Sequence, residues 1–133
     1  MKKIILVILA LMVMGYASAE TLTVQVENVE VGKGLVLIGL YNNEKAFPEP
    51  DRYYTSAKAE PTDKVVTITI PDLPKGVYVA AIYQDKNGND KMDKNLLGIP
   101  TERYGFSNNT MLPDWKKNSF ELNADTSIMI KLR

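Results

Sequence analysis

Apolar and polar residues alternate along much of this chain in short runs that are separated by turn-forming residues. Every second position is apolar in residues 21–27 and again in residues 65–70. A two-residue period places one face of a strand in a core and the other in solvent, so each run predicts a β-strand. Pro71 is expected to end the second run, because proline cannot donate a hydrogen bond to a strand ladder.

Two further runs are apolar on both faces. They are Leu-Val-Leu-Ile-Gly-Leu-Tyr at 35–41 and Val-Tyr-Val-Ala-Ala-Ile-Tyr at 77–83. Short runs rich in β-branched and aromatic residues predict strands covered on both sides. The polar stretch 42–52 contains Phe47-Pro48-Glu49-Pro50, which disfavours both helix and sheet interior, so a surface loop is expected there.

The remaining patterns complete an all-β domain. Residues 53–60 are a weaker strand candidate, and 120–122 and 128–132 alternate across Asn123-Ala124-Asp125, which predicts a terminal hairpin. Six to seven short strands favour a single antiparallel β-sandwich, immunoglobulin-like or transthyretin-like, with a small barrel as the alternative. The motif Leu73-Pro74-Lys75-Gly76-Val77-Tyr78 resembles the entry to a strand in transthyretin-like sandwiches. The expected core includes Val24, Leu37, Ile68, Val79, Phe120 and Ile130.

Residues 1–19 have the organisation of a cleavable signal peptide. Lys2 and Lys3 precede an apolar run at 4–14, and Ala17-Ser18-Ala19 provides a small-x-small cleavage site before Glu20. A membrane anchor is the alternative, but about 18 apolar residues are needed to cross a bilayer. We therefore expect a periplasmic or secreted protein whose single domain spans 20–133, with no membrane span after cleavage.

Composition then restricts the function. Cleavage would leave 133 − 19 = 114 residues, and removal of two lysines would change the balance of charges to 14 − 16 = −2. The mature chain then has no basic excess for binding nucleic acid. The sequence contains neither cysteine nor histidine, which excludes disulfide bonds and the usual zinc and copper ligand sets.

One long stretch, residues 85–109, lacks a clear period, and long loops in compact domains usually have a function. It begins with Asp-Lys-Asn-Gly-Asn-Asp-Lys-Met-Asp, in which oxygen ligands occupy relative positions 1, 3, 5, 7 and 9. This spacing is that of an EF-hand-type calcium loop, because calcium prefers six to eight oxygen ligands. The predicted ligands are Asp85, Asn87, Asn89, the main-chain carbonyl of Lys91, and Asp93, with Glu102 or, as the alternative, Asn95 as an additional ligand.

The match to a calcium loop is incomplete. Relative position 6 is Asp90 where an EF-hand has glycine, and position 12 is Leu96 where an EF-hand has a bidentate glutamate. A plain Asn-Gly turn that binds no metal remains the alternative.

The same stretch continues with a second motif. Together the two parts read Asp85-x-Asn87-Gly88-Asn89-x-x-x-Asp93-x-Asn95-x-x-Gly98-Ile99-Pro100-x-Glu102-x-Tyr104-Gly105-Phe106-Ser107-Asn108-Asn109. This signature resembles that of a family of small exported bacterial proteins, domain of unknown function 2141. The resemblance implies a β-sandwich behind a signal peptide and implies no particular activity.

Large side chains near the end of this stretch are candidates for partner binding. Rigid aromatic and arginine side chains among Asn, Ser and Gly are common at recognition surfaces. The candidates are Arg103, Tyr104, Phe106, Asn108 and Trp115. The alternative is that these rings pack beneath the loop as part of the core.

Three classes of function remain open. A binding module would use a calcium-ordered loop to hold a protein, peptide or glycan of the cell envelope. A structural or assembly component of the envelope would offer a strand edge to another chain. A hydrolase would need a carboxylate pair such as Asp93 and Glu102, and this small domain leaves little room for a substrate cleft.

Overall fold

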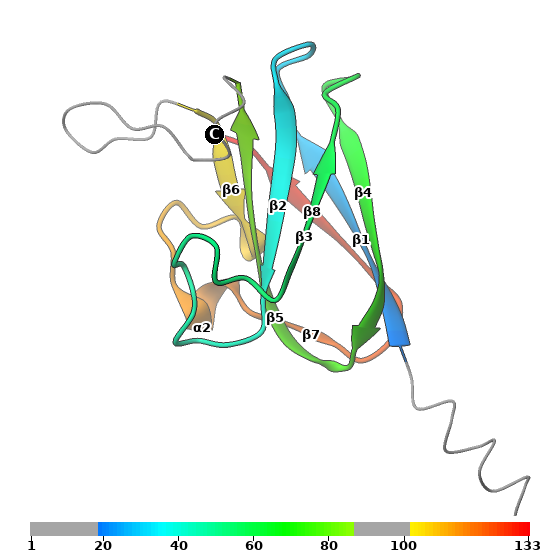
Figure 1. The fold of residues 1–133 in the computed structure, drawn as a ribbon, viewed down its shortest axis with the longest axis vertical. Helices are drawn as coiled ribbons and strands as arrows, with labels where there is room; N and C mark the ends of the chain where they lie inside the picture. Colours follow the sequence, from blue (N-terminus) through cyan, green and yellow to red (C-terminus); the bar gives the residue numbers. More distant parts are fainter. Residues whose placement is uncertain (1–18, 87–101) are drawn as a thin grey trace, which may run out of the picture.

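A computed structural model describes residues 19–86 and 102–133, and this part of the chain folds into two packed β-sheets (Figure 1). The predicted all-β sandwich is confirmed. The strands are β1 (Ala19–Glu27), β2 (Leu35–Tyr41), β3 (Thr55–Ala59), β4 (Val66–Pro74), β5 (Gly76–Asp85), β6 (Tyr104–Phe106), β7 (Phe120–Leu122) and β8 (Thr126–Lys131). Two short helical segments, η1 (Ser107–Asn109) and α2 (Trp115–Asn118), lie between β6 and β7.

The first sheet has the strand order β4-β1-β8, and the second has the order β3-β2-β5-β6. Strand β7 pairs with the beginning of β5, where Tyr78 lies opposite Phe120. All of these pairs are antiparallel except β1 and β8, which run parallel with Val24 opposite Ile128. The expectation of a purely antiparallel sandwich is therefore wrong at this one pair.

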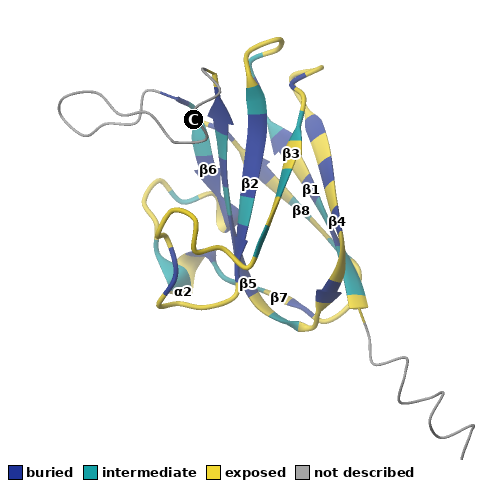
Figure 2. Cartoon of the chain, viewed as in Figure 1, coloured by how far each residue is buried: buried dark blue, intermediate teal, exposed yellow. Residues whose placement is uncertain are grey.

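The core between the sheets comes from the alternating runs. Figure 2 shows buried and exposed bands succeeding one another along β4, whereas β2 is buried over most of its length. Val24, Ile68 and Ile130 of the expected core lie in the cluster between the sheets, and Phe120 is partly buried against it.

A second apolar cluster covers the opposite face of the β2–β5 sheet. It explains why these two strands are apolar on both sides, because Ala80 and Ile82 face the first cluster while Val79 belongs to the second. The loop before β3 contributes Phe47, and Trp115 of α2 packs against the cluster. The buried members are Tyr41, Ala46, Phe47, Val79 and Phe106.

Two expectations about individual elements are wrong. The predicted terminal hairpin does not form, because β7 pairs with β5 in one sheet and β8 pairs with β1 in the other. Alternation predicts a strand but carries no information about its partner. Pro71 does not end β4, which continues to Pro74, because β4 is the outer strand of its sheet and its free edge needs no donor.

The last residues of the chain connect the two sheets at one corner. The Leu132 amide donates to the Glu27 carbonyl at 3.0 Å, and Arg133 and Tyr104 exchange backbone hydrogen bonds of 2.9 and 3.1 Å. Gly105 fits at this crossing because an added Cβ would lie 2.8 Å from Ile130 Cγ2. Within residues 19–86 and 102–133, no helix is long and apolar enough to span a bilayer.

Candidate functional site

The candidate site lies at the end of the sandwich where β5 finishes and the chain returns toward β6. Tyr83 lies opposite Tyr104, and the Gln84 amide donates to the Arg103 carbonyl at 2.9 Å. Asp85 is the last residue of β5, and Glu102 comes directly before Arg103 in the returning segment. Both are buried, with exposed fractions of 1% and 5%.

These two residues are the predicted calcium ligands that fall within the described part of the chain. A Glu102 carboxylate oxygen accepts a hydrogen bond of 2.6 Å from the Lys86 amide, so the carboxylate is held at the end of β5. The other predicted ligands, Asn87, Asn89, Lys91 and Asp93, lie outside the described residues. Among the residues that are described, no three acidic side chains gather into a metal-binding group.

Arg103 follows Glu102 directly and joins a small ionic cluster. Its Nη1 donates to the Asn28 main-chain carbonyl at 2.8 Å, and its Nη2 lies 3.2 Å from a Glu30 carboxylate oxygen. The other Glu30 oxygen pairs with the Lys86 ammonium. A hydrogen bond from Lys86 and the positive charges of Lys86, Arg103 and Lys33 lower the pKa of Glu30, although desolvation opposes them. Glu30 therefore stays ionised between two cations.

Gln84 supports this end of the sandwich from inside. Its side chain is fully buried, and its carbonyl oxygen accepts from the Glu30 amide at 2.9 Å. Its amide nitrogen donates to the Glu30 and Lys33 carbonyls at 2.6 and 2.7 Å. Sequence reasoning missed Gln84, although a polar residue in register with Tyr78, Ala80 and Ile82 on the inward face of a strand was a usable signal.

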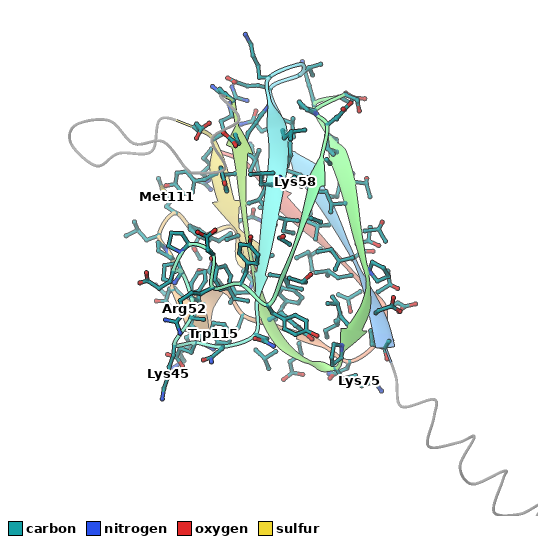
Figure 3. All side chains as sticks on the ribbon, viewed as in Figure 1. Lys45, Arg52, Lys58, Lys75, Met111 and Trp115 are labelled. Carbon is teal, nitrogen blue, oxygen red and sulfur yellow. The ribbon has the colours of Figure 1, made fainter. Side chains whose placement is uncertain are left out.

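Three of the predicted binding residues lie in or against the second apolar cluster. The centroid of the Phe47 ring lies 5.9 Å from that of Phe106 and 6.2 Å from that of Trp115. The Tyr104 ring is 5.8 Å from Phe106, and its hydroxyl donates to the Met111 carbonyl at 3.0 Å. Figure 3 shows Trp115 in the same region as Arg52 and Lys45 of the loop between β2 and β3. The structure thus brings Phe106 and Trp115 together with the core, and places Arg103 at the ionic end.

A comparison with known protein families found a match over most of the chain. The model of one family, described as uncharacterized protein conserved in bacteria, matches residues 24–130. The chain belongs to DUF2141. This confirms the resemblance carried by the motif of residues 85–109. No curated protein and no solved structure showed a significant match to the chain.

In this DUF2141 domain, Asn108 and Asn109 of the signature stabilise the backbone of neighbouring segments through their side chains. Both adopt the left-handed conformation that asparagine tolerates better than most residues, with φ of 63° and 56°. The Asn108 side chain donates to the carbonyls of Lys117 and Ser119 at 2.9 and 3.0 Å. The candidate binding residue Asn108 therefore connects η1 to the end of α2.

Ser107 and Asn118 form a buried polar pair that sequence reasoning also missed. The Ser107 hydroxyl accepts from the Ala80 amide at 3.1 Å and donates to the Asn118 carbonyl. The Asn118 side-chain amide donates to the Ser107 carbonyl at 2.8 Å and to the Thr110 hydroxyl at 2.6 Å. These bonds attach the segment between β6 and β7 to the edge of β5, because buried polar groups need partners.

Proposed function

We propose that this DUF2141 domain is an exported binding module in which calcium orders the segment between Asp85 and Glu102. The single observation that supports it is that Asp85 and Glu102, the two carboxylates that bound this segment, are both buried. Carboxylate oxygens are ligands that calcium prefers, and buried charges in proteins are paired or coordinate metals.

The rest of the ligand set would come from Asn87, Asn89, the Lys91 carbonyl and Asp93. With Asp85 and Glu102 these supply six oxygen-bearing groups, which is the lower end of the range that calcium prefers. Half of these six ligands are neutral, so we expect the weak affinity of extracellular modules, about 10⁻⁴ to 10⁻³ M. The ion would then have a structural role.

Calcium at this position would act on the residues proposed to contact a partner. Arg103 follows Glu102 directly, and Tyr104 begins β6, so ordering at Glu102 also holds these two side chains. The partner would be a protein, peptide or glycan of the envelope. The alternative of an assembly component that pairs through β8 is less well supported, because the Asn109 side chain already bonds to Met129 and Lys131 on that strand.

Thermal unfolding with and without calcium tests the proposal. Calcium at about ten times its dissociation constant should raise the free energy of unfolding by about RT ln 11, or about 1.4 kcal/mol. That corresponds to a melting shift of about 4–10 °C. Magnesium should have a much smaller effect, because it prefers a tighter octahedral shell and loses its water reluctantly.

Two variants identify the ligands. Asp93→Asn and Glu102→Gln should each reduce the calcium-induced shift, whereas Asp63→Asn, in the exposed connection before β4, should leave it unchanged. Asp85 is buried, so an Asp85 variant needs a check of folding by circular dichroism. Equal melting temperatures in millimolar calcium and in chelator would show that residues 85–93 bind no calcium.

Export is tested by N-terminal sequencing of the extracytoplasmic protein, which should begin at Glu20.

A further inference from the structure

A hollow with a volume of about 500 Å³ lies beside the ionic cluster, at the end of the sandwich. The connection from β1 to β2 forms most of it, the connection from β3 to β4 contributes Lys64, and Arg103 precedes β6. Its volume is within the range of small-ligand sites. The lining residues are Asn28, Val29, Glu30, Val31, Lys33, Lys64 and Arg103.

Positive charge predominates in this hollow. Among the described residues that line it, Lys33, Lys64 and Arg103 contribute three positive charges and Glu30 one negative charge, so this part of the lining carries 3 − 1 = +2. The Lys86 ammonium also pairs with Glu30. Glu30, the carboxylate among the described lining residues, is therefore already shared between two cations, and these residues keep an excess of positive charge for a ligand.

The cationic group at the edge of the hollow is held in a defined position. Asn28 accepts hydrogen bonds from Nη1 of Arg103, and a Glu30 carboxylate oxygen forms an ion pair with Nη2. Arginine carries five N–H donors in a planar fork, so its contacts with the described residues leave donors for a ligand. A fixed guanidinium loses little entropy when it binds an oxyanion, which favours binding.

The backbone beneath the hollow is fixed from inside the fold. The buried Gln84 amide bonds to main-chain groups of Glu30 and Lys33, so both ends of this short turn are anchored to β5. Val29 is 3% exposed and anchors the turn in the core, whereas Val31 is 52% exposed and offers apolar surface beside the charges. A preformed turn, two lysines and a fixed arginine are the features of an oxyanion site.

We propose that this hollow binds the oxyanion group, a phosphate or a carboxylate, of a small anionic ligand. Arg103 provides directed hydrogen bonds, and Lys33 and Lys64 provide point charges. Val31 contacts the uncharged part of the ligand. The site uses only described residues and does not require calcium, so it goes beyond the function proposed above.

Three probes with the same sugar ring distinguish the sources of the charge. Glucose 6-phosphate and glucuronate are titrated into the full mature domain in calcium-free buffer, with glucose as the uncharged control. Binding is followed by amide chemical shifts in two-dimensional NMR. We expect saturable shifts at Glu30, Lys33, Lys64 and Arg103 with at least one anionic probe and none with glucose. The stronger of the two anions identifies the preferred group.

Charge-removing variants locate the site. Lys64→Gln and Arg103→Gln should each weaken binding about three- to fivefold, the range of a partly exposed ion pair. Lys116→Gln on α2 removes the same charge elsewhere on the surface and should have no effect. Because Arg103 also contacts Glu30, the Lys64 variant carries the test if the Arg103 variant is destabilised.

Three results would overturn the proposal. They are no saturable shifts with either anion, equal shifts with glucose, and equal weakening in Lys64→Gln and Lys116→Gln. The calcium proposal is tested separately by melting temperature. Loss of the calcium effect with retained anion binding, or the reverse, therefore distinguishes the failure of one proposal from that of the other.

Discussion

The side-chain amide of Asn109 pairs with the backbone of β8 at Lys131 as a neighbouring strand would. Its Oδ1 accepts from the Lys131 amide at 2.9 Å, and its Nδ2 donates to the Met129 carbonyl at 3.2 Å. Strand β8 is the outer strand of its sheet, and free strand edges invite pairing with other chains. One asparagine side chain thus covers part of an edge that could otherwise lead to self-association.

Replacing Asn109 with glycine should uncover this edge. Glycine accepts the φ of 56° without strain, so Asn109→Gly removes the two hydrogen bonds and little else. We expect the free energy of unfolding to fall by about 1–2 kcal/mol. Sedimentation velocity should also show more self-association than in the wild type. Asn123→Gly in the exposed turn before β8 is the control, and equal behaviour of the two variants would contradict the role of Asn109.

Gly32 and Gly34, both in the connection from β1 to β2, should respond differently to substitution. Gly34 has a φ of +59°, and an added Cβ would lie 1.8 Å from the Asp85 carbonyl oxygen. Gly34→Ala should therefore cost more than about 3 kcal/mol or prevent folding, because backbone atoms would have to move.

Gly32 provides the matched comparison. Its φ is +76°, but an added Cβ would have no heavy atom within 4 Å. Gly32→Ala should cost only about 1–2 kcal/mol of left-handed strain. Urea denaturation of both variants measures the difference, and similar costs would show that the contact with Asp85 is easily relieved.

Gln84→Leu should destabilise the ionic end of the domain although it conserves much of the volume. The Glu30 amide and the Glu30 and Lys33 carbonyls would all lose their partner. We expect a loss of about 2–3 kcal/mol, together with faster hydrogen exchange in the 28–34 turn. Gln25→Leu, an exposed glutamine on β1, should have a small effect on stability. An unchanged exchange rate in the turn would contradict the anchoring role of Gln84.

Glu30 should make stability depend on pH in the acidic range. Its pKa is lowered in the folded protein, so its contribution is present above the unfolded pKa, near the usual 4.5, and disappears as pH falls through the lower folded pKa. The wild type should therefore be more stable than Glu30→Gln at pH 6, and this difference should shrink toward pH 3. Because 28% of the Glu30 side chain is exposed and its ion pairs are screened by solvent, the difference should remain below about 1 kcal/mol.

Urea denaturation of both proteins at pH 6, 4.5 and 3 measures this difference. Glu44→Gln, in the exposed loop after β2, is the control. A constant difference between the wild type and Glu30→Gln across this range would contradict the ion pairs with Lys86 and Arg103.

The sequence by itself determined most of the segments that become strands and which side of each is buried, but not β6, which lies within the stretch expected to be a loop. Residues 21–27 and 65–70 alternate with a two-residue period, and they form β1 and most of β4 with that alternation in burial. Residues 35–41 and 77–83 are apolar on both sides, and both are covered on two faces. These properties are local, because backbone geometry sets the side-chain period and hydrophobicity selects the inner face.

Tertiary structure alone decided which strands pair and which polar groups meet. The last two strands join different sheets, and the parallel partner of β8 is β1, far away in the sequence. The burial of Asp85 and Glu102, the anchoring by Gln84 and the cover provided by Asn109 all depend on how the strands are placed. Register depends on packing over the whole domain, and one polar residue at a core position or one asparagine in a loop does not specify a partner.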